Sequence, residues 1–243
     1  MYRKMDAVRE FFLIVACIAL ICCQRRPEDR RIVCVAASKS GKWIAAGTAA
    51  GRIAVWDIGN PGRPVLAKED DGVLNEFRFS RDEQWLAIAG RNLTVRPPAQ
   101  FDKPRTLRGD GRNYGSAQFS PVADTILTID GKGAIEILDA KSGRAIASAC
   151  CSTIGGAVAF TPDGARFIGA GHLPRMWDAR TGALVARMSR ERQFMTLGPI
   201  AFRGDQVLMG SQDGGIYIWN WRTGRIAGTS PSTSDWVDTI AVQ

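Results

Sequence analysis

The chain contains a single histidine, His172, within the glycine-rich stretch 169–174. A serine triad would need that histidine beside an activated nucleophile, but no Gly-x-Ser-x-Gly elbow accompanies it. One imidazole also excludes metal sites built on two histidines. No phosphate-binding Gly-x-x-x-x-Gly-Lys-Ser/Thr motif occurs among the glycines. The sequence therefore predicts no catalytic, cofactor-binding or metal-binding residue, and His172 is predicted to lie in a solvated loop.

Several aspartates stand where a turn is expected. Asp130 and Asp213 lie in predicted hairpin turns, where an aspartate bonds its own backbone, so we interpret them as turn formers. Tryptophan–aspartate pairs and their equivalents recur along the chain. We predict that these tryptophans fill a core and that these aspartates satisfy turn amides. This set consists of Trp56, Asp57, Asp139, Trp177, Asp178 and Trp219.

The basic residues do not indicate a nucleic-acid site. Lys and Arg number 32 against 24 Asp and Glu, a net charge of +8, and residues 1–31 contribute seven minus four, or +3, of it. The remaining +5 is a mild bias. Arg187, Arg190, Arg192 and Phe194 could form an RNA-binding strip, but Glu191 interrupts them and aromatic residues do not interleave. Arg-Gly-Asp occurs at 108–110 and 203–205, and the second copy occupies a turn position.

The N-terminal region combines a charged flank with an apolar run. Residues 11–23 carry no charge and follow Arg3, Lys4 and Arg9. As a helix this run spans roughly 20 Å, short of a hydrocarbon core of roughly 30 Å. Its length suits a signal peptide, and the arginines after it leave a signal anchor open. Residues 20–23 resemble an imperfect bacterial lipobox, which makes Cys22 or Cys23 candidates for lipidation. The remaining alternative is a spurious start region before the domain.

The remaining cysteines are Cys34, Cys150 and Cys151, and they form no Cys-x-x-Cys pair. We predict that each is a small buried apolar residue.

A repeat organises the rest of the chain. Similar strand-like segments end at Ser38, Ser80, Ser120, Thr161, Arg203 and Gln243, a spacing of 40 to 42 residues. The tryptophan–aspartate landmark follows each of the first five segments in phase. Two landmarks with one period indicate a repeat architecture.

Each repeat contains four short apolar strands separated by turn residues, and residues after 31 contain no long helical run. The fold class is therefore all-β, built from four-stranded antiparallel units packed on both faces. The units are expected at about 31–70, 73–110, 114–150, 155–190 and 197–229, with the inner strand of a sixth at 236–243, and 1–30 is expected to form a hydrophobic helix. In the second repeat, at about 73–110, Arg96-Pro97-Pro98 replaces Trp-Asp and predicts an irregular strand end or an exposed edge.

The repeated pattern over residues 31–243 resembles WD40 repeats, with degenerate units. The resemblance implies a β-propeller of five blades. The family's Gly-His dipeptide is missing and His172 does not occupy its place, so the buried hydrogen-bond tetrad that this dipeptide seeds is not expected. Related propellers of the quinoprotein or YVTN kind remain possible relatives. Because a lone sixth strand follows the fifth unit, we expect an open arc, truncated relative to a longer relative, and a ring closed on five blades is the rival.

The resemblance implies a non-enzymatic protein–protein interaction scaffold, membrane-anchored or exported, with no nucleic-acid partner, no small-molecule substrate and no cofactor. Loops mapped to one rim of such a propeller supply the predicted protein contacts. These contacts are Arg91, Arg112, Tyr114, His172, Arg192, Phe194 and Trp236. Two alternatives stay open. One is an exported propeller enzyme resembling quinoprotein dehydrogenases or propeller hydrolases, and the other is a cytosolic WD40 fragment.

Overall fold

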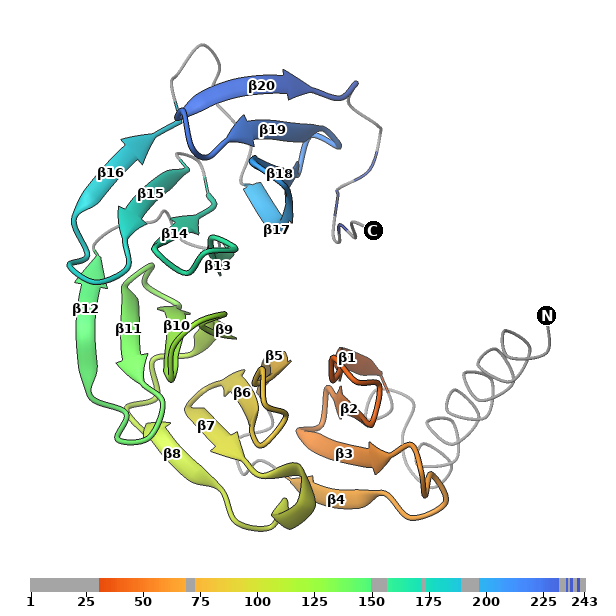
Figure 1. Ribbon diagram of the computed structural model, residues 1–243. Coiled ribbons are helices and arrows are strands. Elements are labelled where there is room, and N and C mark those ends of the chain that lie inside the picture. The colour runs from red at the N-terminus through yellow and green to blue at the C-terminus, as the bar shows by residue number, and fades with distance from the viewer. Residues whose placement is uncertain are drawn as a thin grey trace. The chain divides into compact units, whose positions relative to one another are not determined.

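A computed structural model describes residues 31–68, 73–149, 157–171, 174–188, 197–231, 235, 237 and 240. These residues form five four-stranded antiparallel sheets, each with its strands in sequence order (Figure 1). The all-β class and the four-stranded unit are therefore confirmed. The expected N-terminal helix lies outside the described residues, and so does most of the expected inner strand at 236–243. Both stay predictions.

The chain divides into two compact units, Met1–Arg105 and Thr106–Gln243. The first sheet consists of β1 (Ile32–Ala37), β2 (Trp43–Thr48), β3 (Arg52–Asp57) and β4 (Val65–Lys68). The second consists of β5 (Leu74–Phe79), β6 (Leu86–Gly90), β7 (Leu93–Arg96) and β8 (Arg105–Arg108). The boundary between the units falls inside β8.

The second unit contains the three remaining sheets. The third sheet has β9 (Tyr114–Phe119), β10 (Thr125–Asp130), β11 (Ile135–Asp139) and β12 (Ala145–Ala149). The fourth has β13 (Val158–Phe160), β14 (Arg166–Gly169), β15 (Arg175–Asp178) and β16 (Leu184–Arg187). The fifth has β17 (Leu197–Arg203), β18 (Gln206–Ser211), β19 (Ile216–Asn220) and β20 (Arg225–Thr229).

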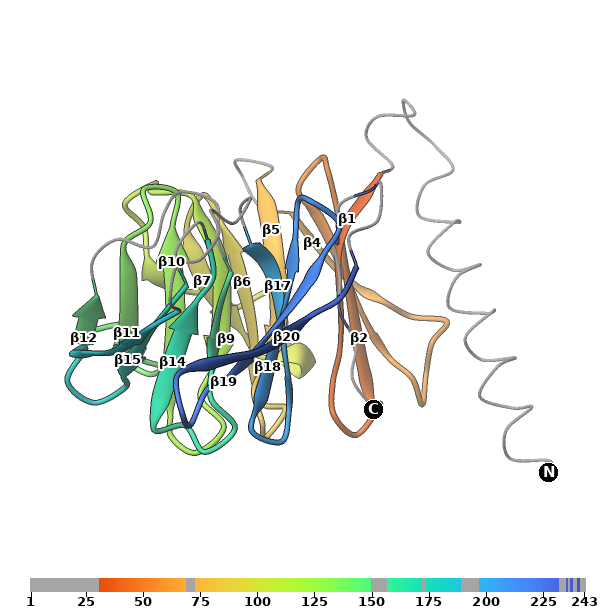
Figure 2. The ribbon, with the colours of Figure 1, turned by 90° about the horizontal axis from the view of Figure 1, so that it is seen from above.

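Hydroxyl side chains close the hairpin between the first two strands of several sheets. Ser80 Oγ accepts a hydrogen bond from Trp85 N at 3.0 Å, and Thr161 Oγ1 accepts one from Arg166 N at 3.1 Å. Such side-chain acceptors satisfy turn amides and favour reversal of the chain. The hairpin turns of the second unit lie at the two ends of its strands (Figure 2).

The core of the second unit lies between successive sheets. Phe167 and Trp177 stack with ring centroids 5.2 Å apart and pack with Leu127 and Ile137 of the third sheet. On the opposite face of the fourth sheet, Met176 packs in a cluster that includes residues of β18 and β19. The fourth sheet is therefore covered on both faces, which explains why its strands are apolar runs and do not alternate.

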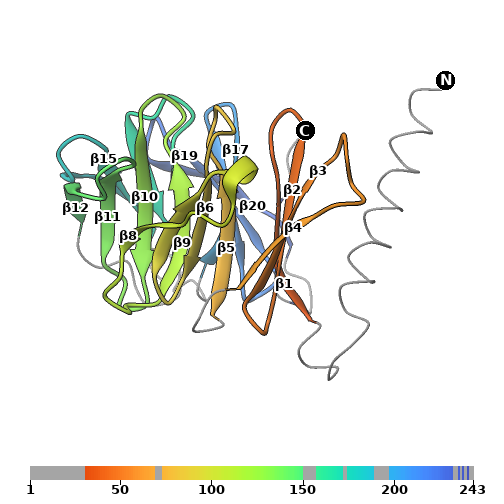
Figure 3. The same cartoon turned by 90° about the horizontal axis from the view of Figure 1, so that it is seen from below.

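The second sheet departs from the pattern at the proline pair. Strand β7 ends at Arg96, and a 3-10 helix, Pro98–Gln100, follows it (Figure 3). Because β7 lies between β6 and β8, the prolines end an interior strand and do not mark a sheet edge. Of the two alternatives expected here, the irregular strand end is the correct one.

Candidate functional site

The recurring tryptophans belong to the core. Trp56, Trp177 and Trp219 expose 1%, 3% and 0% of their surface. The indole Nε1 groups of Trp56 and Trp219 are buried and have no hydrogen-bond partner in the described part of the chain. These rings therefore stabilise the sheets and are not offered to a partner.

The aspartates at the ends of the third strands cap the next turn. Asp139 Oδ1 accepts from Ser142 N at 2.6 Å and Ser142 Oγ at 2.7 Å. Asp178 Oδ1 accepts from the amide and hydroxyl of Thr181, both at 2.8 Å. In each case the hydroxyl is the largest cause that holds the pKa of the carboxyl below its usual value. Asp57 Oδ1 likewise accepts from Gly59 N at 2.9 Å. These carboxylates act as fixed acceptors in turns.

The hairpin aspartates have the same kind of role. Asp130 Oδ1 accepts from Lys132 N and Ala134 N, both at 2.9 Å. Asp213 Oδ1 accepts from Gly215 N at 2.9 Å, and its Oδ2 accepts from Tyr217 OH at 2.7 Å. The structure thus confirms both as turn formers.

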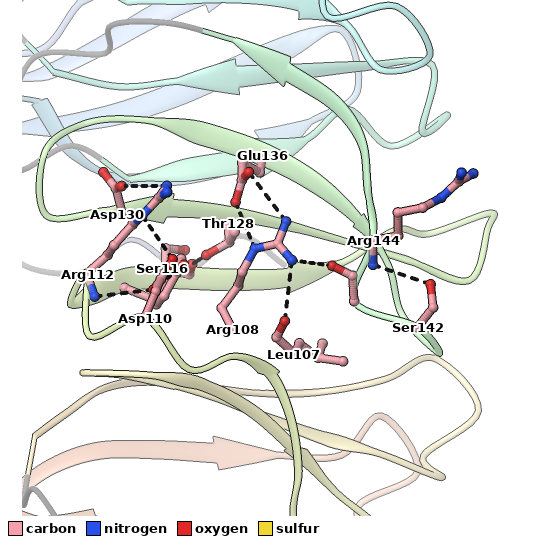
Figure 4. Close-up of polar contacts among 12 residues, drawn as sticks. Leu107, Arg108, Asp110, Arg112, Ser116, Thr128, Asp130, Glu136, Ser142 and Arg144 are labelled. Atoms are coloured by element: carbon pink, nitrogen blue, oxygen red, sulfur yellow. Dashed lines mark hydrogen bonds and ion pairs between the residues drawn. The ribbon is translucent and has the colours of Figure 1, made fainter.

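Arg112 is the predicted contact residue with the most defined surroundings. Its Nε lies 2.9 Å from Asp110 Oδ2, and its guanidinium reaches Asp130 Oδ2 at 3.6 Å (Figure 4). A carboxylate of the same loop and one at the end of β10 therefore hold a side chain that is still 46% exposed. A positioned, half-exposed guanidinium can donate to a carboxylate or carbonyl of a partner at little entropic cost.

Tyr114 differs from the other predicted contacts because it is buried, with 1% of its surface exposed. Its hydroxyl donates to Asp110 Oδ1 at 3.0 Å, and burial is the largest cause that raises the pKa of the phenol. Tyr114 therefore supports the Arg112–Asp110 pair from the interior. An alanine variant would therefore lose core packing, which makes Tyr114 a structural residue and not an exposed contact.

A second network joins two sheets through Arg108, and no sequence pattern other than the Arg-Gly-Asp tripeptide indicated it. Arg108 Nε lies 3.2 Å from Glu136 Oε2 on β11. The same guanidinium donates to the carbonyl oxygen of Gly143, in the turn after β11 (Figure 4). The outer strand β8 is thereby attached to the third sheet.

Arg91 is exposed in the turn between β6 and β7. The other predicted contact and lipidation residues lie outside the described residues, so their placement stays a prediction. They are His172, Arg192, Phe194, Trp236, Cys22 and Cys23.

Within the described residues, no group of three or more His, Cys, Asp or Glu side chains could hold a metal ion. A helix both long and apolar enough to cross a membrane is also absent from that part of the chain.

Repeated four-stranded antiparallel sheets define a β-sheet repeat protein. In the first, fourth and fifth sheets the third strand carries a buried tryptophan and ends in a residue that caps the next turn. Residues 21–57 match the family described as WD domain, G-beta repeat. Residues 21–57 are thus similar to a WD40 repeat, and the predicted resemblance to WD40-repeat proteins is confirmed. The match begins inside the apolar run 11–23.

Two known proteins extend this comparison. An uncharacterised WD repeat-containing protein of Synechocystis sp. is 34% identical over 134 residues, which are 53% of this chain and 38% of that protein. The chain therefore matches well under half of the length of this relative. The crystal structure of the computationally designed Ika8 protein superposes with a TM-score of 0.71 at 18% identity, covering 87% of this chain and 65% of that one. This second likeness concerns the fold alone.

Proposed function

We propose that the chain is a non-enzymatic protein-interaction scaffold, held at a membrane or exported by its N-terminal segment. The observation that carries this proposal is that the aspartates accept hydrogen bonds within turns while arginines at loops stay exposed. Asp57, Asp139 and Asp178 are used up as turn acceptors, whereas Arg91 and Arg112 stand exposed or half-exposed at loops. Carboxylates committed to turns favour a binding role over general acid–base chemistry.

The proposed contact surface consists of the rim residues other than the buried tyrosine. Arginine and aromatic side chains dominate binding energy at protein interfaces, which supports this choice. We define the rim set as Arg91, Arg112, His172, Arg192, Phe194 and Trp236.

Affinity capture from a cell extract tests the rim set. Combined Phe194→Ala and Trp236→Ala replacement is expected to lower the amount of the main captured protein by at least about tenfold, since loss of a hot-spot residue costs roughly 2 kcal/mol or more. The matched control is Ile146→Ala with Val185→Ala, which removes apolar residues exposed on β12 and on β16. Equal capture by the rim variant and the wild type would contradict the proposed site.

Fractionation tests the membrane part of the proposal. The full chain is expected to sediment with membranes or to be recovered outside the cytosol. Combined Cys22→Ser and Cys23→Ser replacement should release it from membranes if lipidation holds it there. Recovery of the unprocessed chain in the cytosolic fraction alone would overturn this part and leave the scaffold proposal standing.

A further inference from the structure

Turns in the second unit sit against the outer strand of the preceding sheet. A Cβ built on Gly143 would lie 2.8 Å from Leu107 O on β8, and one built on Gly182 would overlap Ser148 O on β12. On the next sheet, a Cβ on Gly224 would lie 3.7 Å from Ala186 Cβ on β16. Three outer strands, β8, β12 and β16, are thus each approached by a following turn.

Strand β20 is also an outer strand, and no such glycine contact with it is found among the described residues. Figure 1 shows it at the edge of the fifth sheet, opposite β17. Arg225, Ile226, Ala227 and Thr229 are exposed, and a Cβ on Gly228 would meet nothing within 4 Å. An outer strand with free backbone groups is a template for an added strand.

The register of β20 sets which side chains an added strand would meet. Ile226 pairs with Trp219 and Arg225 pairs with Asn220, so Ile226 and Arg225 lie on opposite faces of the sheet. Ile226 is 37% exposed, and it lies on the face where Trp219 packs with residues of the fourth sheet. An added strand therefore meets an aliphatic side chain on one face and a guanidinium on the other.

Charge decides which partner suits this edge. Strand β20 contains no acidic residue, and no carboxylate in the described part of the chain forms an ion pair with Arg225. An acidic side chain on the partner would supply the missing charge, and an aliphatic one would extend the apolar contact at Ile226.

We infer that the outer edge of β20 binds an extended peptide of alternating acidic and aliphatic residues as a fifth strand. This inference rests on the proposed scaffold function and names a second surface for it. The backbone provides affinity through ladder hydrogen bonds, and the alternation provides register and specificity.

Binding of synthetic nine-residue peptides to the full chain tests the inference. The probe is a fluorescent peptide of alternating valine and glutamate, compared with a valine–lysine peptide and with a valine–glutamate peptide N-methylated at alternate residues. The valine–glutamate peptide is expected to bind at least about tenfold more tightly than either, because the others lack the charge match or the amide donors. Equal binding of the N-methylated peptide would overturn strand addition.

Variants locate the site. Arg225→Glu is expected to weaken binding of the valine–glutamate peptide by about tenfold, since it replaces an attraction by a repulsion. Arg203→Glu makes the same charge change at an exposed residue of β17 and should alter affinity less than about twofold. Hydrogen exchange should slow for amides of residues 225–229 when peptide is bound. Equal weakening by both variants, or no protection of β20, would overturn the site.

The outcome is separable from that of the rim set. Phe194→Ala with Trp236→Ala is expected to leave the affinity for the valine–glutamate peptide unchanged. If the peptide fails to bind while rim variants still abolish partner capture, the β20 inference falls and the proposed function stands.

Discussion

The second and fourth sheets use different residues to stabilise the end of their third strand and the turn that follows it. In the fourth sheet, Trp177 near the end of β15 stacks on Phe167, and Asp178 caps the next turn. In the second sheet, Arg96 occupies the end of β7 and is buried. Its guanidinium donates to Phe101 O at 3.0 Å and lies 5.1 Å from the centre of the Phe101 ring.

The difference shows what the repeat requires after its third strand. One requirement is a large apolar group, and the other is a polar group that holds the following turn. In the fourth sheet two neighbouring residues meet them, whereas in the second Phe101 supplies the apolar group with none of its surface exposed and Arg96 holds it in place. The repeat therefore keeps a pair of physical functions and not a fixed pair of residues.

The largest expected effect is on the fourth sheet. Trp177→Ala removes a ring that packs with residues of the third sheet and of its own sheet, and it should lower the free energy of unfolding by about 3–5 kcal/mol. Urea unfolding followed by circular dichroism measures this loss. Trp177→Phe is the control and should cost clearly less, because it keeps a stacked ring. A cost below about 1 kcal/mol for the alanine variant would show that Trp177 is not a core residue.

The next effect tests the turns that sit on outer strands. Gly182 and Gly224 have φ of +73° and +72°, so alanine at either position costs about 1–2 kcal/mol of conformational strain. Only at Gly182 would the new Cβ also collide with backbone, which should add about 1–3 kcal/mol. Thermal unfolding of Gly182→Ala and Gly224→Ala makes the comparison. Equal losses would mean that the Gly182 contact with β12 is not close in solution.

Arg96→Met tests whether the contact of Arg96 with Phe101 stabilises the second sheet. Methionine keeps apolar volume but loses the hydrogen bond to Phe101 O and the contact with its ring, so the free energy of unfolding should fall by about 1.5–3 kcal/mol. Arg91→Met, at the exposed turn of the same sheet, should change it by less than about 0.5 kcal/mol. Denaturant unfolding distinguishes the two, and equal small effects would refute a structural role for Arg96.

The smallest effect concerns pH. The pKa of Asp178 is lowered in the folded chain, chiefly by the Thr181 hydroxyl, so its contribution is present above the unfolded value and is lost as pH falls through the lowered pKa. Asp178→Asn can still accept the turn hydrogen bonds, as Asn220 does in the fifth sheet from Thr223 N at 2.9 Å.

At pH 6 this variant should therefore differ from the wild type by less than about 0.5 kcal/mol. Between pH 5 and pH 2 it should lose less stability than the wild type. Melting temperatures across this range provide the measurement, and an acid loss identical to that of the wild type would exclude Asp178 as a contributor.

The sequence predicted the repeated sheets well because each repeat carries two local signals, a turn after its first strand and a landmark after its third. The proline pair at 97–98 is another local signal, and it correctly predicted an irregular strand end. Turn roles of Asp130 and Asp213 were predictable for the same reason, since their hydrogen bonds lie within four residues.

The rest depended on contacts between repeats. Arg108 meets Glu136 and Gly143 at separations of 28 and 35 residues, which no local pattern encodes. Tyr114 was expected on a binding rim. Whether the side chain of the first residue of a strand is buried or exposed, however, depends on the sheet beside it. Its burial follows from that packing and from the acceptor that Asp110 provides.

The turns that sit on preceding outer strands give the second unit a mechanical polarity. Each of these contacts links a sheet only to the one before it: the fifth sheet meets β16 at Gly224 and packs on the fourth sheet through the Met176 cluster, and no such glycine contact with β20 is found among the described residues. Structures coupled only to nearest neighbours come apart stepwise. Within the second unit, a pulling force applied beyond β20 should detach the fifth sheet before the fourth and free the edge of β16. The fourth and third sheets would then unravel in turn, from the C-terminal side toward β8.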